Sequence, residues 1–162
     1  MVPEWFNGFT LFGTYPPGWV FFTYPLLKIL GNIMLATFIS MILLFILGFI
    51  GINILGKELK MSPIKRIAFF LFVYANPMII GAVLKQGRLP ALMGLVLFTY
   101  IVYIGLYFKE REVNKKIILL GILFGLIIIT HQAETILSGI FILGLILIKS
   151  NKERILALLL EY

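Results

Sequence analysis

The chain has 162 residues, of which 61% are hydrophobic and only 13% are charged. A soluble domain of this size keeps about a quarter of its residues charged, and so short a chain cannot hide this much apolar surface in its own core. We therefore expect its surface to face lipid. The net charge of +7 includes no long basic run, which excludes a nucleic-acid partner, and the absence of cysteine excludes disulfides and thiolate chemistry.

The first 31 residues are predicted to form an external region at the membrane interface. Turn-forming residues recur up to Gly18, together with tryptophan and tyrosine side chains that suit the headgroup layer. A short interfacial helix is expected over residues 17–30. Pro17 fits the first turn of such a helix, and Lys28 can extend toward lipid headgroups.

Long apolar stretches separated by short polar loops predict an all-α, polytopic transmembrane bundle forming one membrane domain, 1–162. About five spans are expected, over residues 32–55, 67–84, 91–108, 117–130 and 135–148. The stretch 117–148 is divided because one helix of that length would overshoot the bilayer. Residues 149–162 are expected to be a tail or the start of a further helix.

Three patterns inside these spans bear on packing and on ligands. The pair Asn76-Pro77 predicts a kink, with a broken-helix binding site of the transporter kind as the alternative. Gly121 and Gly125 form a GxxxG pair, which favours close approach of a neighbouring helix. Three tyrosines share one helix face and are interpreted as packing residues or as a polar path: Tyr100, Tyr103 and Tyr107.

The basic residues are sorted between alternate loops. Eleven lysines and arginines fall in residues 56–66, 109–116 and 149–162, whereas three lie in the other set of loops: Lys28, Lys85 and Arg88. The positive-inside rule places the richer set in the cytoplasm. The protein is therefore predicted to be a multi-pass protein of the cell membrane, in contact with membrane lipids, with its N-terminal loop outside and its C-terminal tail cytoplasmic.

The external side then gathers the residues that could carry chemistry. His131 and Glu134 are ionisable groups at membrane depth, where such groups are costly and often functional, and a solvated turn is the alternative. One histidine and one glutamate are too few to predict a divalent metal site, so no metal or other cofactor is expected. Glu4 is the other external acid. It and Glu134 are the candidate catalytic carboxylates, with an exposed charge as the alternative for Glu4.

A tight loop on the same side contains Gln86 and Arg88. Arginine can bind a phosphate with two parallel hydrogen bonds, so this loop is a candidate site for a phospholipid or polyprenyl-phosphate head. An interfacial anchor is the alternative. No nucleotide-binding, metalloprotease or serine-hydrolase motif occurs in the chain.

Several short segments resemble the polytopic GT-C glycosyltransferase superfamily. They are closest to archaeal membrane proteins labelled as related to 6-pyruvoyl-tetrahydropterin synthase. The segments that carry this resemblance are Pro3-Glu4-Trp5-Phe6-Asn7-Gly8, Leu11-Phe12, Tyr15-Pro16-Pro17-Gly18, Leu30-Gly31-Asn32, Gly87-Arg88-Leu89-Pro90 and Thr130-His131.

The resemblance implies a transferase that takes a sugar from a polyprenyl-phosphate carrier at the outer face. Arg88 would contact the phosphate, and His131 would contribute to the pocket. Gln86 and Tyr15 are further candidates for binding the substrate or its phosphate. Such enzymes usually carry a catalytic aspartate after an upstream first span, and this chain has neither. We therefore expect a fragment or truncated member, completed by the rest of a longer polypeptide or by a partner membrane subunit. The alternatives are a transporter or channel subunit and a non-catalytic structural membrane subunit.

Overall fold

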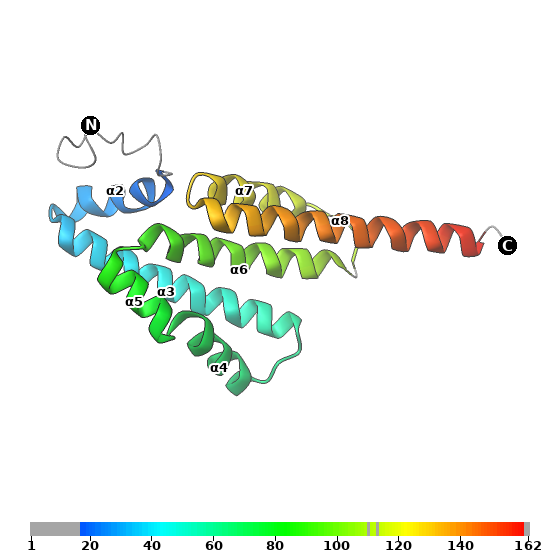
Figure 1. Cartoon of the computed structure of the whole chain (residues 1–162), viewed down its shortest axis with the longest axis horizontal. Coiled ribbons are helices and arrows are strands. Elements are labelled where there is room, and N and C mark those ends of the chain that lie inside the picture. The colour runs from blue at the N-terminus through cyan, green and yellow to red at the C-terminus, as the bar shows by residue number, and fades with distance from the viewer. Residues whose placement is uncertain (1–16, 110, 113, 161–162) are drawn as a thin grey trace.

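The computed structural model describes residues 17–109, 111–112 and 114–160, and every regular element within these ranges is an α-helix (Figure 1). The predicted all-α helical bundle is thus confirmed. In chain order the helices are α2 (Gly18–Leu30), α3 (Ile33–Glu58), α4 (Pro63–Tyr74), α5 (Pro77–Gln86), α6 (Leu89–Lys109), α7 (Lys116–Ile128) and α8 (Gln132–Leu160).

Three helices are long and apolar enough to cross a bilayer: α3, α6 and the Gln132–Lys149 part of α8. The bent pair α4–α5 adds a fourth if it is counted as one span. α7 has only 13 residues, so it extends about 20 Å against a hydrocarbon core of about 30 Å. The described ranges therefore hold three or four candidate spans, and the fifth, expected over residues 117–130, stays a prediction.

The chain turns sharply between α2 and α3 because two residues cap the facing helix ends. Gly31 has a φ of 65° and donates its N–H to the Leu27 carbonyl, a left-handed conformation that glycine adopts without strain. The Asn32 side chain then accepts the N–H of Leu35 at 3.0 Å, which begins α3. As a result, α2 folds back over the start of α3 (Figure 1), and the helix predicted over residues 17–30 is confirmed.

The centre of the bundle is a parallel pair, α3 and α6. The Tyr100 hydroxyl of α6 donates to the Leu47 carbonyl of α3 at 3.0 Å. Arg111, just beyond α6, pairs with Glu58 at the end of α3 at 2.5 Å. Two parallel neighbours need a return segment between them, and α4–α5 supplies it.

The return segment is bent by 43° at its break, which confirms the predicted kink. The Asn76 amide nitrogen donates to the Phe72 and Val73 carbonyls at 2.9 and 3.1 Å, and its oxygen accepts the Ile79 N–H at 3.0 Å. One side chain therefore satisfies backbone groups on both sides of the break. The helical pair also begins earlier and ends later than the predicted span 67–84, at Pro63 and Gln86.

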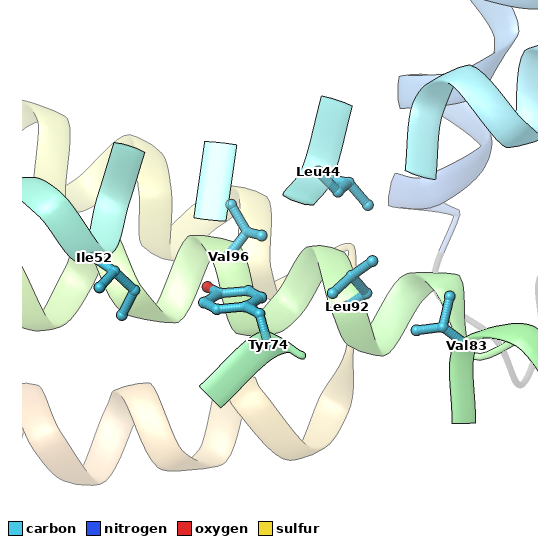
Figure 2. Packing of buried hydrophobic residues seen from close by; sticks show 6 residues of the cluster. All are labelled: Leu44, Ile52, Tyr74, Val83, Leu92 and Val96. Atoms are coloured by element: carbon cyan, nitrogen blue, oxygen red, sulfur yellow. The ribbon is translucent and has the colours of Figure 1, made fainter. Parts of the chain in front are cut away.

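A cluster of buried side chains joins α3, α4, α5 and α6 (Figure 2). Its centre is Tyr74, which is fully buried. Gly48 makes room for it, because a Cβ at that position would lie 2.7 Å from the Tyr74 ring. The remaining members of the cluster are Leu44, Ile52, Val83, Leu92 and Val96.

The stretch 117–148 is divided as predicted, but the turn lies slightly earlier. α7 ends at Ile128 and α8 begins at Gln132, so Glu134 belongs to the first turn of α8 and not to the connection. A carboxylate there is favoured by the positive end of the helix dipole. The residues after Lys149, expected to be a tail or the start of a further helix, continue α8 without interruption to Leu160 (Figure 1), although the part of α8 apolar enough to cross a bilayer ends at Lys149.

The GxxxG prediction is also wrong for the part of the chain that the structure describes. A Cβ added at Gly121 or Gly125 would meet nothing within 4 Å, so no helix packs closely against them. The close approaches use other glycines. A Cβ at Gly105 of α6 would lie 2.5 Å from the Phe141 ring of α8, so this glycine lets α6 and α8 approach each other.

The bundle has two chemically different ends. One end gathers α2, the connection between α5 and α6, and the α7–α8 turn. We call it the polar end. The other end gathers the loops after α3 and α6 together with Lys149, whose ammonium donates to the Arg111 carbonyl at 3.2 Å. We call it the lysine end, since it holds Lys57, Lys60, Lys65, Arg66, Lys109, Arg111, Lys115, Lys116 and Lys149.

Candidate functional site at the α7–α8 turn

The α7–α8 turn is held in one conformation by its own hydrogen bonds. The Ile127 carbonyl accepts the N–H groups of Thr130 and His131, both at 3.0 Å. The Thr135 hydroxyl lies 2.8 Å from the His131 carbonyl oxygen and 3.0 Å from that of Ile127. Thr130 is fully buried, and its hydroxyl donates to the Leu126 carbonyl at 2.6 Å. The residues next to this turn are therefore positioned by a rigid scaffold.

The beginning of α2 docks directly on this turn. The Gly18 N–H donates to the Ile129 carbonyl at 2.6 Å. A Cβ at Gly18 would lie 2.6 Å from the same carbonyl oxygen and 2.5 Å from the Thr130 hydroxyl. Only glycine allows so close a contact, which joins the first described helix to the last hairpin.

His131 and Glu134 form a hydrogen-bonded pair at the start of α8. The Nδ1 atom of His131 is bonded to Oε2 of Glu134, and the side chains are 24% and 16% exposed. The pair rests on α6 at Gly94, where an added Cβ would lie 3.1 Å from both the His131 Cβ and the Glu134 carboxylate. The solvated turn, which is the alternative interpretation of the sequence, stays a prediction for this partly exposed pair.

This hydrogen bond fixes the imidazole ring. Because Glu134 bonds to Nδ1, the second ring nitrogen, Nε2, takes no part in the pair. A carboxylate that holds one nitrogen of a histidine orients the ring and sets which nitrogen carries the proton. With the proton on Nδ1, Nε2 is left as a hydrogen-bond acceptor and a proton acceptor.

Gln86 and Arg88 lie on the same end of the bundle, where α5 meets α6. Gly87 closes α5 with a φ of 63°, and the Arg88 N–H donates to the Ala82 carbonyl at 3.1 Å. The side chains of Gln86 and Arg88 are both exposed. Gly94 follows Arg88 by six residues of nearly continuous helix. The His131–Glu134 pair, which rests on Gly94, therefore lies about 9 Å from Arg88 along the axis of α6.

The structure therefore brings four of the predicted site residues to one end: Gln86, Arg88, His131 and Glu134. Two further candidates, Glu4 and Tyr15, fall outside the described residues. Among the residues that the structure describes, no three histidine, cysteine or acidic side chains come together in a way that could hold a metal ion.

The predicted alternatives inside the spans have structural roles. The amide of Asn76 is bonded to the helix ends beside it, as described above. Tyr100 bonds to α3, whereas Tyr103 and Tyr107 lie under the Lys116 ammonium, which is 3.6 Å from the centre of the Tyr107 ring. These rings fix a lysine at the lysine end by cation–π contact, and they also pack against buried side chains of α6 and α7, as the packing interpretation predicts.

The sequence analysis did not identify Gly94, which supports the His131–Glu134 pair. A signal was present. Gly94 and Gly105 are eleven residues apart, about three helical turns, so they share one face of α6. That face is where α8 packs. The reasoning also missed the Tyr74 hydroxyl, which lies 2.8 Å from the Thr99 hydroxyl in the core and has no periodic pattern to reveal it.

Comparisons of the chain with known protein families, with curated proteins and with solved structures gave no match.

Proposed function

We propose that the protein is a multi-pass protein of the cell membrane whose polar end faces outside and whose lysine end faces the cytoplasm. The distribution of charge supports this orientation, because lysine and arginine near span ends are retained on the cytoplasmic side. Of the fourteen lysines and arginines, the polar end carries three: Lys28, Lys85 and Arg88. The exposed apolar side chains on the helices suit contact with lipid. Phe72, for example, is 77% exposed and Met78 is 83% exposed.

The orientation predicts which positions an impermeant thiol reagent can reach. The native chain has no cysteine, so single cysteines can be introduced without a background signal. In intact cells we expect labelling at Asn7, Gln86 and Gln132. Cysteines at Lys60, Lys115 and Asn151 should react only after the membrane is opened. Labelling of position 132 from the cytoplasmic side would overturn the proposed orientation.

We further propose that the polar end binds the head of a polyprenyl-phosphate-linked sugar. The observation that carries this proposal is the His131–Glu134 pair, held on Gly94 about 9 Å along α6 from Arg88. A guanidinium can bind a phosphate with paired hydrogen bonds. The fixed imidazole presents Nε2 as an acceptor for a sugar hydroxyl. The prenyl chain would remain in the lipid beside the helices.

The transporter alternative receives less support from the geometry. A broken transmembrane helix binds ions or substrate through backbone groups that its break leaves free. At the break between α4 and α5, the Asn76 side chain occupies two carbonyls and one N–H. This break is therefore satisfied internally.

The binding proposal is tested with a fluorescent short-chain polyprenyl-phosphate sugar and purified protein in detergent. We expect Arg88→Ala to weaken binding about tenfold or more, since a hydrogen bond to a charged group contributes about 1.5–3 kcal/mol. His131→Ala should also weaken it. Lys85→Ala, which removes another exposed cation near Arg88, is the matched control and should bind like the native chain.

The same variants separate the rival functions. If neither Arg88→Ala nor His131→Ala alters binding of the lipid-linked sugar, the proposal is wrong. A change confined to solute flux in proteoliposomes would indicate a transporter or channel subunit. No change in either measurement would indicate a structural membrane subunit.

A further inference from the structure

A second feature lies at the opposite end of the bundle, where α7 and α8 separate. They are joined by the tight turn at the polar end, yet an apolar groove opens between them toward the lysine end. One cavity of about 320 Å³ lies among α6, α7 and α8, and an adjoining cavity of about 420 Å³ lies between α7 and α8. The two share the side chains of Ile117, Leu120, Ile142 and Ile146, so they form one continuous groove.

Glycines on both walls keep this groove open. Gly121 of α7 and Gly139 of α8 both line it. An added Cβ would meet nothing within 4 Å at Gly121, and only the Phe124 ring at 4.0 Å at Gly139. In tightly packed helix pairs, glycine serves to bring backbones together. Here the absent side chains leave room for a further apolar group.

The mouth of the groove, at the lysine end, is cationic. Lys109, at the end of α6, and Lys149 of α8 both line the cavity of about 320 Å³. Lys149 is held toward this end by its bond to the Arg111 carbonyl at 3.2 Å. Lys116 is held nearby on the rings of Tyr103 and Tyr107. The groove thus combines an apolar channel along the helices with ammonium groups at its mouth.

We propose that this groove binds one anionic glycerophospholipid. An acyl chain lies between α7 and α8, and the headgroup phosphate lies against Lys109 and Lys149. The positive charges of Lys109 and Lys149 support the choice of an anionic lipid. Lysines at a membrane surface attract anionic headgroups, and the walls offer an acyl chain only apolar contact. The site is separate from the polar end and does not depend on the function proposed for it.

Bound lipid also resolves a mismatch in length. α7 extends only about 20 Å, whereas the Gln132–Lys149 part of α8 extends about 27 Å, so α8 reaches further toward the lysine end. A single lipid seated between α7 and α8 fills the space that two helices of unequal length leave open. Phosphatidylcholine, with no net charge, lacks the electrostatic part of this fit.

The test counts lipid retained by the purified full-length chain in detergent, using native mass spectrometry with phosphatidylglycerol or phosphatidylcholine added in equal amounts. We expect the native chain to retain phosphatidylglycerol preferentially. Lys109→Gln and Lys149→Gln should each weaken retention about fivefold. Gly121→Leu, which fills the groove, should reduce it at least tenfold. Gly125→Leu is the matched control, because Gly125 lies on the same helix with open space beside it but lines neither cavity.

Equal retention of the two lipids by the native chain would overturn the proposal. So would native retention by Gly121→Leu when its helix content, measured by circular dichroism, matches that of Gly125→Leu. If Gly121→Leu does not fold, the two lysine variants decide the question. Lys85→Gln, which removes one of the cations at the polar end, should leave phosphatidylglycerol retention unchanged. Failure of sugar binding at the polar end would not affect any of these measurements.

Discussion

Replacing Tyr74 with alanine is expected to lower the free energy of unfolding by about 3–5 kcal/mol, the range found for truncating a large buried aromatic side chain. Tyr74 is fully buried where α3, α4 and α6 meet (Figure 2). Its ring occupies the space left by Gly48 and stacks on Phe70 with ring centres 5.4 Å apart. The truncation would leave a cavity at the centre of the cluster that fixes the bent return segment to the parallel pair.

The size of this effect is measured by unfolding the protein in mixed micelles with increasing fractions of a denaturing detergent. Tyr74→Phe separates the ring from the hydroxyl. It removes the bonds of the hydroxyl group to Thr99 and to the Leu95 carbonyl, and bonds of this kind within membranes average about 0.6 kcal/mol each. Phe72→Ala is the control, since this neighbouring ring is 77% exposed. If Tyr74→Ala lowers the free energy of unfolding no more than Phe72→Ala does, the proposed core is contradicted.

Replacing Gly94 with leucine is expected to separate His131 and Glu134 and to abolish binding at the polar end. An alanine Cβ would lie 3.1 Å from the histidine Cβ and from the carboxylate, so Gly94→Ala requires a shift of only a few tenths of an ångström. Its helix propensity, about 1 kcal/mol better than that of glycine, offsets that strain. The leucine side chain has no such room, and overpacking of this kind costs about 1–3 kcal/mol.

The outcome is directly observable because His131 is the only histidine of the chain. Nitrogen-15 chemical shifts of its imidazole ring report which nitrogen carries the proton. We expect the native chain and Gly94→Ala to show the proton on Nδ1, and Gly94→Leu to lose that preference. Gly81→Leu is the control, since a Cβ there meets nothing within 4 Å. If Gly94→Leu kept the native shifts, α6 would not be the support of the pair.

Much of the architecture could be predicted from local pattern. Apolar runs located the helices, and Asn76-Pro77 located the break, because proline cannot continue a helix and asparagine caps the next one. The length of the stretch 117–148 required a division, which the structure confirms. The predicted turn ends at residue 134, whereas the connection in the structure ends at residue 131. The carboxylate of Glu134 is stabilised by the helix dipole in the first turn of α8, and this favours a helical position over a place in the loop.

The rest depended on contacts between distant segments. The pairing of Gly48 with Tyr74, and of Gly94 with His131, follows from the register of whole helices against one another. No local rule states that register, because a small rotation of α8 would exchange the residues that face α6. For the same reason Gly121 and Gly125 were predicted to draw helices together, whereas the structure leaves space beside them.

The bond between Gly18 and Ile129 ties the beginning of the described chain to its last hairpin. During synthesis α2 emerges long before that hairpin exists. It can pack on the start of α3 early, but its bond to Ile129 must wait until the α7–α8 turn has been made. The polar end is thus the last region to be completed, and a ribosome stalled before Ile129 is made would hold a chain in which α2 lacks this second support.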